Sequence, residues 1–214
     1  MKKTEIILKE GYNFISSIFF IFFFALIMTN DFWWQFFWFI ALVFMVYFFS
    51  NPERIPEEVG DDVIISPADG EIIEITEIEE PYFTNREMIK ISIRLSLLDN
   101  HIQRSPISGK LVKSQYIHGE FLTLSSEKAS ELNEQNRTLF ENRNMSVVVN
   151  QIAGFITRRI VTFREEGDIQ LAERYGMIMF GSQVDLYIPK ETRIKVLVGE
   201  KVKGGESLIG IVVR

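Results

Sequence analysis

One long apolar region stands at the start of the chain, and apolar and polar positions alternate in the rest. Residues 14–28 and 32–49 are almost wholly apolar, and Thr29-Asn30-Asp31 separates the two runs. Each run is near the lower limit for a helix that crosses a bilayer, about 17 residues. Two such runs, with no small-residue cleavage site after the first, argue against a removable signal peptide. We therefore predict a helical hairpin that spans or enters a membrane.

The residues around this hairpin predict its orientation. Basic side chains lie before and after it: Lys2, Lys3, Lys9 and Arg54. The positive-inside rule then places both ends, and the polypeptide that follows, on the cytoplasmic side of the cell membrane. Tryptophans follow the turn, where an interfacial aromatic belt is expected: Trp33, Trp34 and Trp38. The alternative is a hairpin buried in a globular core, which the remaining chain is poorly able to cover.

The remainder of the chain has the pattern of short strands. Runs that are β-branched or alternate in polarity predict strands at residues 63–65, 71–75, 88–94, 110–117, 146–152, 159–163, 184–188 and 193–198. We expect the last two to share a sheet with residues 177–180. Residues 128–136 form the best helix candidate, capped by Ser125 or Ser126. The predicted fold is α+β, with barrel-sandwich-like antiparallel sheets in residues 56–214 behind a helical hairpin in residues 1–55.

A short motif occurs twice within this strand-rich part. Ser66-Pro-Ala-Asp-Gly70 and Ser105-Pro-Ile-Ser-Gly109 share the pattern S-P-x-x-G, and each leads into an alternating run. Glycine-rich residues 198–210 indicate another strand–turn–strand segment. Turns of this kind recur in small barrel-sandwich domains, including lipoyl-like carriers, so the pattern is also compatible with a domain that has no catalytic function.

Composition removes several classes of function. The net charge is −6 and no basic stripe is present, which argues against a nucleic-acid partner. The chain has no cysteine, so disulfides, a thiolate nucleophile and thiolate metal sites are excluded. It has only two histidines, His101 and His118, which makes a multi-histidine centre improbable and limits the groups that transfer protons near neutral pH. We predict no metal site.

A small polar interruption lies inside an apolar stretch near the end of the chain. Gly181-Ser182 separates residues 177–180 from residues 184–188, and both of these segments are apolar. A β-bulge or a turn is the ordinary explanation for glycine at such a point. The dipeptide alone therefore does not indicate chemistry.

An ordered set of motifs gives the dipeptide another meaning. In sequence order and spacing, the chain resembles the short-form phosphatidylserine decarboxylase proenzymes over essentially its whole length. The segments that carry this resemblance are Phe48-Phe-Ser-Asn-Pro-Glu-Arg54, Ser66-Pro-Ala-Asp-Gly70, Asp99-Asn-His-Ile-Gln-Arg-Ser-Pro106, Lys128-Ala-Ser-Glu-Leu-Asn-Glu-Gln-Asn136, Gln151-Ile-Ala-Gly-Phe-Ile-Thr-Arg-Arg-Ile-Val161 and Glu173-Arg-Tyr-Gly-Met-Ile-Met-Phe-Gly-Ser-Gln-Val-Asp-Leu-Tyr-Ile-Pro189. Each segment is weak evidence alone, and the ordered set is specific.

The resemblance implies self-cleavage between Gly181 and Ser182. The products would be a large chain, 1–181, and a small chain, 182–214, that stay together as a heterodimer, with any further oligomeric state left open. Ser182 would become a pyruvoyl group, the only cofactor, whose ketone forms a Schiff base with the amine of phosphatidylserine. Loss of carbon dioxide would give phosphatidylethanolamine, a step of phospholipid biosynthesis at the bilayer. Glycine suits a close approach to its carbonyl, and the Ser182 hydroxyl is an intramolecular nucleophile.

The resemblance also implies supporting residues. Asp69 falls on the catalytic acidic position of the family, and His101 on the first histidine of its Asp-x-His motif. Arg104 stands where long-form bacterial enzymes carry a second histidine, and arginine stays protonated in proteins, so it is no general base. We expect His101 to act in the chemistry, Arg104 to bind a phosphate or carboxylate, and His118 to be structural or exposed. The base for self-cleavage stays open.

Two other functions remain in view. The chain could be a membrane-anchored, non-enzymatic barrel-sandwich adaptor or carrier, although it shows no lipoyl-type lysine at a hairpin tip and no long coiled-coil insertion. A pyruvoyl decarboxylase of free amino acids is a further alternative, although a soluble substrate gives a membrane hairpin no evident purpose.

Overall fold

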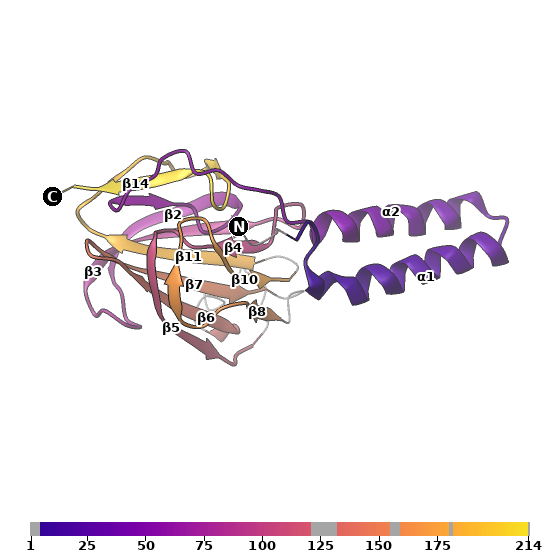
Figure 1. Cartoon of the computed structure of the whole chain (residues 1–214), viewed down its shortest axis with the longest axis horizontal. Coiled ribbons are helices and arrows are strands. Elements are labelled where there is room, and N and C mark those ends of the chain that lie inside the picture. The colour runs from indigo at the N-terminus through magenta and orange to yellow at the C-terminus, as the bar shows by residue number, and fades with distance from the viewer. Residues whose placement is uncertain (1–4, 121–131, 155–158, 180–181, 214) are drawn as a thin grey trace. The chain divides into compact units, whose positions relative to one another are not determined.

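The computed structural model describes residues 5–120, 132–154, 159–179 and 182–213, and the side chain of Ser182 is outside this description. The chain divides into two compact units, residues 1–53 and 54–214. The first unit contains the helices and the second contains the strands (Figure 1).

The first unit is the predicted helical hairpin. A short 3-10 helix, η1 (Lys9–Gly11), leads into α1 (Tyr12–Met28), and α2 (Phe32–Phe48) returns beside it (Figure 1). Asp31 caps α2, because its Oδ1 accepts from the backbone N–H of Trp33 at 2.9 Å. The Phe22 and Phe39 rings pack between the helices, with centroids 5.9 Å apart. The two apolar runs and the polar turn are therefore confirmed as helix, turn and helix.

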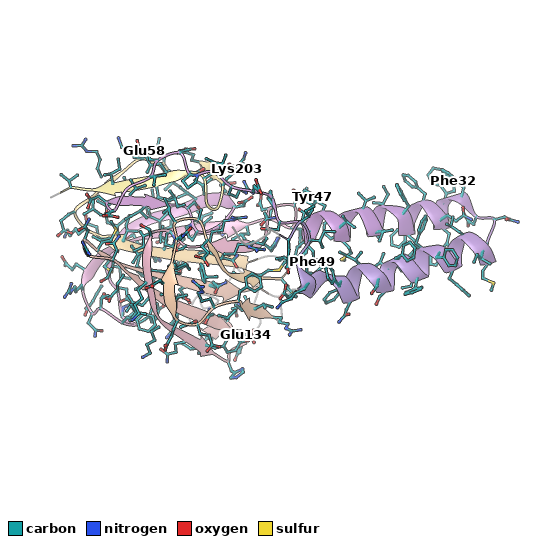
Figure 2. All side chains as sticks on the ribbon, in the orientation of Figure 1. Phe32, Tyr47, Phe49, Glu58, Glu134 and Lys203 are labelled. Carbon is teal, nitrogen blue, oxygen red and sulfur yellow. The ribbon has the colours of Figure 1, made fainter. Side chains whose placement is uncertain are left out.

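Most large apolar side chains of the hairpin are exposed. Phe20 is 67% exposed and Trp33 is 74% exposed, so packing in the core of a water-soluble protein does not account for this apolar surface. Together, η1 and α1 give the segment Lys9–Met28, which is long and apolar enough to cross a membrane. Figure 2 shows Phe32 at the turn end of α2 and Phe49 at its other end.

The second unit consists of antiparallel sheets. One sheet has eight strands in the order β13-β2-β3-β11-β7-β6-β5-β9, and two sheets have three strands each, β1-β14-β12 and β4-β10-β8. The strands are β1 (Val63–Ile65), β2 (Gly70–Glu79), β3 (Glu87–Leu95), β4 (Ile102–Arg104), β5 (Gly109–Ile117), β6 (Gln135–Glu141), β7 (Ser146–Ala153), β8 (Ile160–Thr162), β9 (Gly167–Ile169), β10 (Arg174–Ile178), β11 (Ser182–Pro189), β12 (Thr192–Ile194), β13 (Lys201–Val202) and β14 (Leu208–Val212). This confirms a strand-rich antiparallel fold behind two helices, and the described strands form no closed barrel.

The second unit is built from two interleaved copies of one arrangement. The order of the eight-stranded sheet reads as β13-β2-β3-β11 followed by its counterpart in reverse, β9-β5-β6-β7. Each half has its own three-stranded sheet, and the register shifts at the matching points of β2 and β5. The copy built from β4 to β10 is continuous in sequence, whereas β1–β3 and β11–β14 make the other. The chain therefore crosses from one copy to the other immediately before β11.

The main core lies between the eight-stranded sheet and the two small sheets. Val184, Leu186 and Ile188 of β11 belong to it, as do Tyr175 of β10 and Ile209 of β14. Alternate residues of a strand face opposite sides of a sheet. Tyr187 accordingly packs in a separate cluster on the other face, with Met88, Leu139 and Val148.

Two predictions of local structure need correction. Residues 128–131 lie outside the described residues, but Gln135 and Asn136 belong to β6, so the helix predicted at 128–136 is wrong at its end. Backbone pairing with β7 and β5 prevails there over a polar composition that suits a helix. In residues 193–198, only Arg193 and Ile194 are in a strand, β12, and that strand pairs with β14 rather than sharing the sheet of β11.

Candidate active site

Ser182 is the first residue of β11, an inner strand of the large sheet. Its backbone pairs with Leu95 of β3 on one side and with Ala153 of β7 on the other. Leu95 is 3% exposed and Ala153 is fully buried. Gly181, the other half of the predicted cleavage site, lies outside the described residues. The position of Ser182 is thus fixed by a neighbouring strand on each side.

The segments before and after the dipeptide belong to different sheets. β10 pairs with β4 and β8, whereas β11 pairs with β3 and β7. The expectation that residues 177–180 and 184–188 share one sheet is therefore wrong. The apolar pattern is the same for both strands, because each is buried against the common core. The chain passes from one sheet to the other between Ile178 and Ser182, so a bulge within one strand does not describe this part of the sequence.

His101 lies at the start of β4, opposite the end of β10. Its carbonyl accepts from the N–H of Ile178 at 3.1 Å, and Ile178 is four residues before Ser182 in the sequence. The imidazole is fully buried, and Nδ1 lies 2.7 Å from the Asp99 carbonyl oxygen. Burial lowers the pKa of His101 to about 4, although the Asp99 carbonyl opposes this shift. The ring is therefore neutral near pH 7, with Nδ1 as the donor and Nε2 as the acceptor.

Asp69 sits at the end of the first S-P-x-x-G turn and is held by several donors. Its Oδ1 accepts from the Gly204 N–H at 2.7 Å, and its Oδ2 lies 2.8 Å from Nη2 of Arg54. Burial raises the pKa of Asp69, and the charge of Arg54 is the largest opposing influence. The backbone N–H of Asn100 is a further partner. This contact joins Asp69 to the residue that precedes His101, so the fold brings the two predicted residues to one place.

Arg104 is buried on the side of β4 opposite to His101. Residues 101 and 103 share one face of this strand and residues 102 and 104 share the other. Nη1 of Arg104 donates to the Ala172 carbonyl at 3.2 Å, and the residue is 7% exposed. Burial lowers the pKa of Arg104 to about 10, with smaller contributions from the cations Arg54 and Arg174. Arg104 therefore belongs with Asp69 and Arg54, and not with the imidazole.

Arg54 is a member of this site that the sequence interpretation missed. Besides Asp69, its guanidinium pairs with Oε1 of Glu206 at 3.2 Å. The sequence pattern places Arg54 only at the flank of the hairpin. The motif Asn51-Pro-Glu-Arg54 carried a signal, since it is among the segments on which the resemblance depends.

Two further expectations concern histidine and metals. His118 is exposed and lies edge-on to the Tyr116 ring, with centroids 5.1 Å apart, which makes it a surface residue as expected. In the ranges that the structure describes, no group of three or more histidine, aspartate or glutamate side chains is arranged to hold a metal ion.

Comparison with known proteins identifies the family. The family model for phosphatidylserine decarboxylase matches residues 41–210. A phosphatidylserine decarboxylase proenzyme of Geotalea uraniireducens is 40% identical over 212 residues, which cover 98% of each chain. One of Rickettsia typhi is 40% identical over 96% of this chain and 90% of its own. One of Ehrlichia chaffeensis is 45% identical over 77% of this chain and 74% of its own. The chain therefore belongs to the phosphatidylserine decarboxylase family and is an enzyme of that family.

Proposed function

We propose that this chain is a proenzyme that cuts itself between Gly181 and Ser182 and then decarboxylates phosphatidylserine to phosphatidylethanolamine. The observation that carries the proposal is the position of the dipeptide. Ser182, its second residue, begins β11 after the chain has left the sheet of β10, and it is paired on both sides. The relatives that match over nearly the whole chain are named as proenzymes, in agreement with a processing step.

Self-cleavage needs only the atoms of the chain and water. The Ser182 hydroxyl oxygen bonds to the Gly181 carbonyl carbon, the C–N bond breaks, and the nitrogen takes up the hydroxyl proton, which leaves an ester and a free amine. Loss of the Ser182 α-proton then breaks the Cβ–O bond and releases Gly181 as a carboxylate. Water replaces the nitrogen of the resulting dehydroalanine, and ammonia leaves. A pyruvoyl group remains at the new terminus of the small chain, 182–214.

The described residues fit this group. A cofactor at the first residue of β11 would be held in place by Leu95 and Ala153, so its position would not depend on a flexible terminus. When present, the ketone supplies an electron sink for the electron pair that carbon dioxide leaves behind. His101 is neutral and buried near the junction, so its Nε2 is suited to accept or return a proton there.

The charged cluster near Asp69 fits the polar part of the lipid. We assign to Asp69 a role in the chemistry, next to the loop that carries His101. Arg54 holds this carboxylate, which keeps Asp69 in one orientation. We assign to Arg104 the binding of the phosphate or carboxylate of the substrate, because its fork of donors matches such groups.

The hairpin provides a reason for a lipid substrate. Its exposed apolar surface, with Phe20 at 67% and Trp33 at 74%, suits contact with acyl chains. We propose that it anchors the enzyme in the cell membrane, with residues 54–214 on the cytoplasmic side. The basic residues Lys9 and Arg54 at its two ends support this orientation. Reporter fusions that place the catalytic unit on the outer side would contradict it.

The test is to express the full chain, separate it under denaturing conditions and weigh the products. We expect two pieces, 1–181 and 182–214. The small piece should be lighter by one ammonia than the simple hydrolysis product, and it should resist Edman degradation because it lacks a free amine. Borohydride should attach phosphatidylserine to this piece and should attach no amine when lipid is omitted.

Ser182→Ala is the matched control, since it removes both the nucleophile and the precursor of the pyruvoyl group. It should stay as one chain without activity. A single intact chain in freshly purified wild-type protein would refute the proposal and would favour the non-enzymatic adaptor or carrier instead.

A further inference from the structure

Glu134 is a buried carboxylate that no role assigned so far explains. The residue is 6% exposed, and its Oε1 has no hydrogen-bond partner in the described part of the chain. Buried polar atoms are nearly always paired, because an unpaired one loses its hydrogen bonds to water without replacement. A carboxylate oxygen left open inside the protein therefore points to a partner that arrives during function.

The backbone places Glu134 in one row with Ser182. The Glu134 carbonyl accepts from the N–H of Ala153 at 2.9 Å, and Ala153 is the ladder partner of Ser182 on its other side. Neighbouring strands lie about 4.8 Å apart, so the Cα atoms of Glu134 and Ser182 are about 10 Å apart. Only the methyl group of Ala153 stands between them on that row. An extended glutamate side chain covers about half of this distance.

Glu134 faces the sheet that carries His101. Residues of the same parity on β6, such as Phe140, belong to the core between the sheets. The Tyr116 hydroxyl is hydrogen-bonded to Glu134, and Arg159 lies close enough to contribute its charge there. Arg159 leads into β8, and its carbonyl accepts from the N–H of Met179 at 3.2 Å. Glu134 thus lies near Arg159, whose carbonyl binds the backbone of Met179, three residues before Ser182.

Other described groups near the junction are less suited to accept a proton from Ser182. Arg104 stays protonated, and Asp69 is engaged by Arg54 and Gly204. The His101 ring is bound at Nδ1 to the Asp99 carbonyl, and the proposed function assigns this residue to the lipid chemistry. Asp185 is buried on the same strand as Ser182, but its odd position directs it to the opposite face from Val184. Glu134 lies on the core face of the sheet, is aligned with Ser182 across Ala153, and has a carboxylate oxygen without a partner among the described residues.

We propose that Glu134 is the general base of self-cleavage, an inference that rests on the proposed function. Its Oε1 accepts the proton of the Ser182 hydroxyl as that oxygen bonds to the Gly181 carbonyl carbon. It gives the same proton to the Ser182 nitrogen as the C–N bond breaks. The carboxylate ends as it began, and no electrons or further reactants are needed. The Tyr116 hydroxyl orients the carboxylate by binding its other oxygen.

The experiment follows cleavage of the full chain after a short pulse of cell-free synthesis with lipid vesicles, by denaturing electrophoresis. Glu134→Gln keeps the size and the acceptor for Tyr116 but removes the base. We expect cleavage to slow by a factor of about 10²–10⁴, with an unfolding midpoint near that of Ser182→Ala. Glu120→Gln is the matched control, because its backbone pairs with that of Glu134 while its side chain is exposed. It should cleave like the wild type.

A second measurement separates a base from a structural carboxylate. Glu134→Ala leaves space for a small carboxylic acid, and added formate should restore cleavage to this variant but not to Ser182→Ala. Cleavage of Glu134→Gln at the wild-type rate would overturn the inference, and so would a folded Glu134→Ala that formate fails to rescue. These outcomes differ from failure of the proposed function, in which the wild-type chain itself stays intact.

Discussion

The hydroxyls of Ser66 and Ser105 make the same contact at equivalent points of the two structural copies. Ser66 donates to the Ala68 carbonyl at 2.7 Å, and Ser105 donates to the Ile107 carbonyl at 2.6 Å. The two turns also bind each other, since the N–H of Ile65 donates to Pro106 and that of Arg104 donates to Pro67. The repeated motif is therefore a pair of interlocked turns.

Gly109 should tolerate no side chain. A Cβ at this position would lie 2.2 Å from the Glu141 carbonyl oxygen, which is backbone and cannot move aside, and φ is +154°. We expect Gly109→Ala to lower the free energy of unfolding by more than about 2 kcal/mol, measured by urea titration. Gly60→Ala is the control, because its nearest contact would be Val63 Cγ2 at 3.3 Å. Equal stability of the two variants would contradict this account.

Removing Arg54 should expose the cost of a buried carboxylate. Asp69 and Arg54 side chains are 15% and 10% exposed, and Arg54 is the main influence that holds down the pKa of Asp69. We expect Arg54→Gln to raise that pKa further and to cost about 1–3 kcal/mol at pH 7. The loss should shrink as pH falls and Asp69 takes up a proton. Lys203→Gln, which breaks only the exposed pair with Glu206, should cost less than about 1 kcal/mol. Equal losses of the free energy of unfolding in both variants would contradict a stabilising role of Arg54 toward the buried Asp69.

His101 should make the protein sensitive to mild acid. Its pKa is lowered to about 4 from 6.5, so between these values the unfolded chain binds a proton that the folded one does not. The contribution of His101 to the free energy of unfolding is therefore fully present above pH 6.5. It is lost as pH is lowered toward 4, by up to about 3 kcal/mol. Urea titrations at several pH values should show that the free energy of unfolding changes less with pH in His101→Gln than in His118→Gln, which replaces an exposed histidine. Identical slopes would show that His101 titrates normally.

Replacing Asp185 by asparagine should stabilise the protein. Asp185 is 3% exposed, burial raises its pKa, and its cross-strand partner Asn150 has an Oδ1 without a donor among the described residues. The folded state holds the Asp185 proton more tightly, so stability is lost as pH rises above the usual carboxyl range. Asp185→Asn removes this charge and offers an N–H₂ group to Asn150. We expect a gain of about 1 kcal/mol at pH 7 that disappears in acid.

Asp168→Asn is the control for that variant, since Asp168 is exposed, and its thermal midpoint should not change. A lower midpoint for Asp185→Asn at pH 7 would mean that the ionised form is the one the fold stabilises.

Sequence patterns predicted local features better than pairings. The hairpin, the turns before Gly70 and Gly109 and most strands follow from spacing that is visible within a few residues. The crossover before Ser182 does not, because β10 and β11 bury similar side chains and differ only in distant partners. The same holds for the site. The motifs indicated Asp69 and His101, whereas Arg54 and Glu134 matter through contacts with residues far along the chain.

The central position of β11 has a consequence for how such a terminus is made. Polypeptide ends normally lie at the surface of a domain, but a cut before Ser182 would create an end inside a sheet, with a strand on each side. A separately synthesised small chain would have to insert itself between β3 and β7, two strands whose edges would otherwise be free to pair with each other. A chain that folds whole and is cut afterwards avoids that problem. Biosynthesis as a single precursor is then the assembly route by which an interior residue becomes the first one.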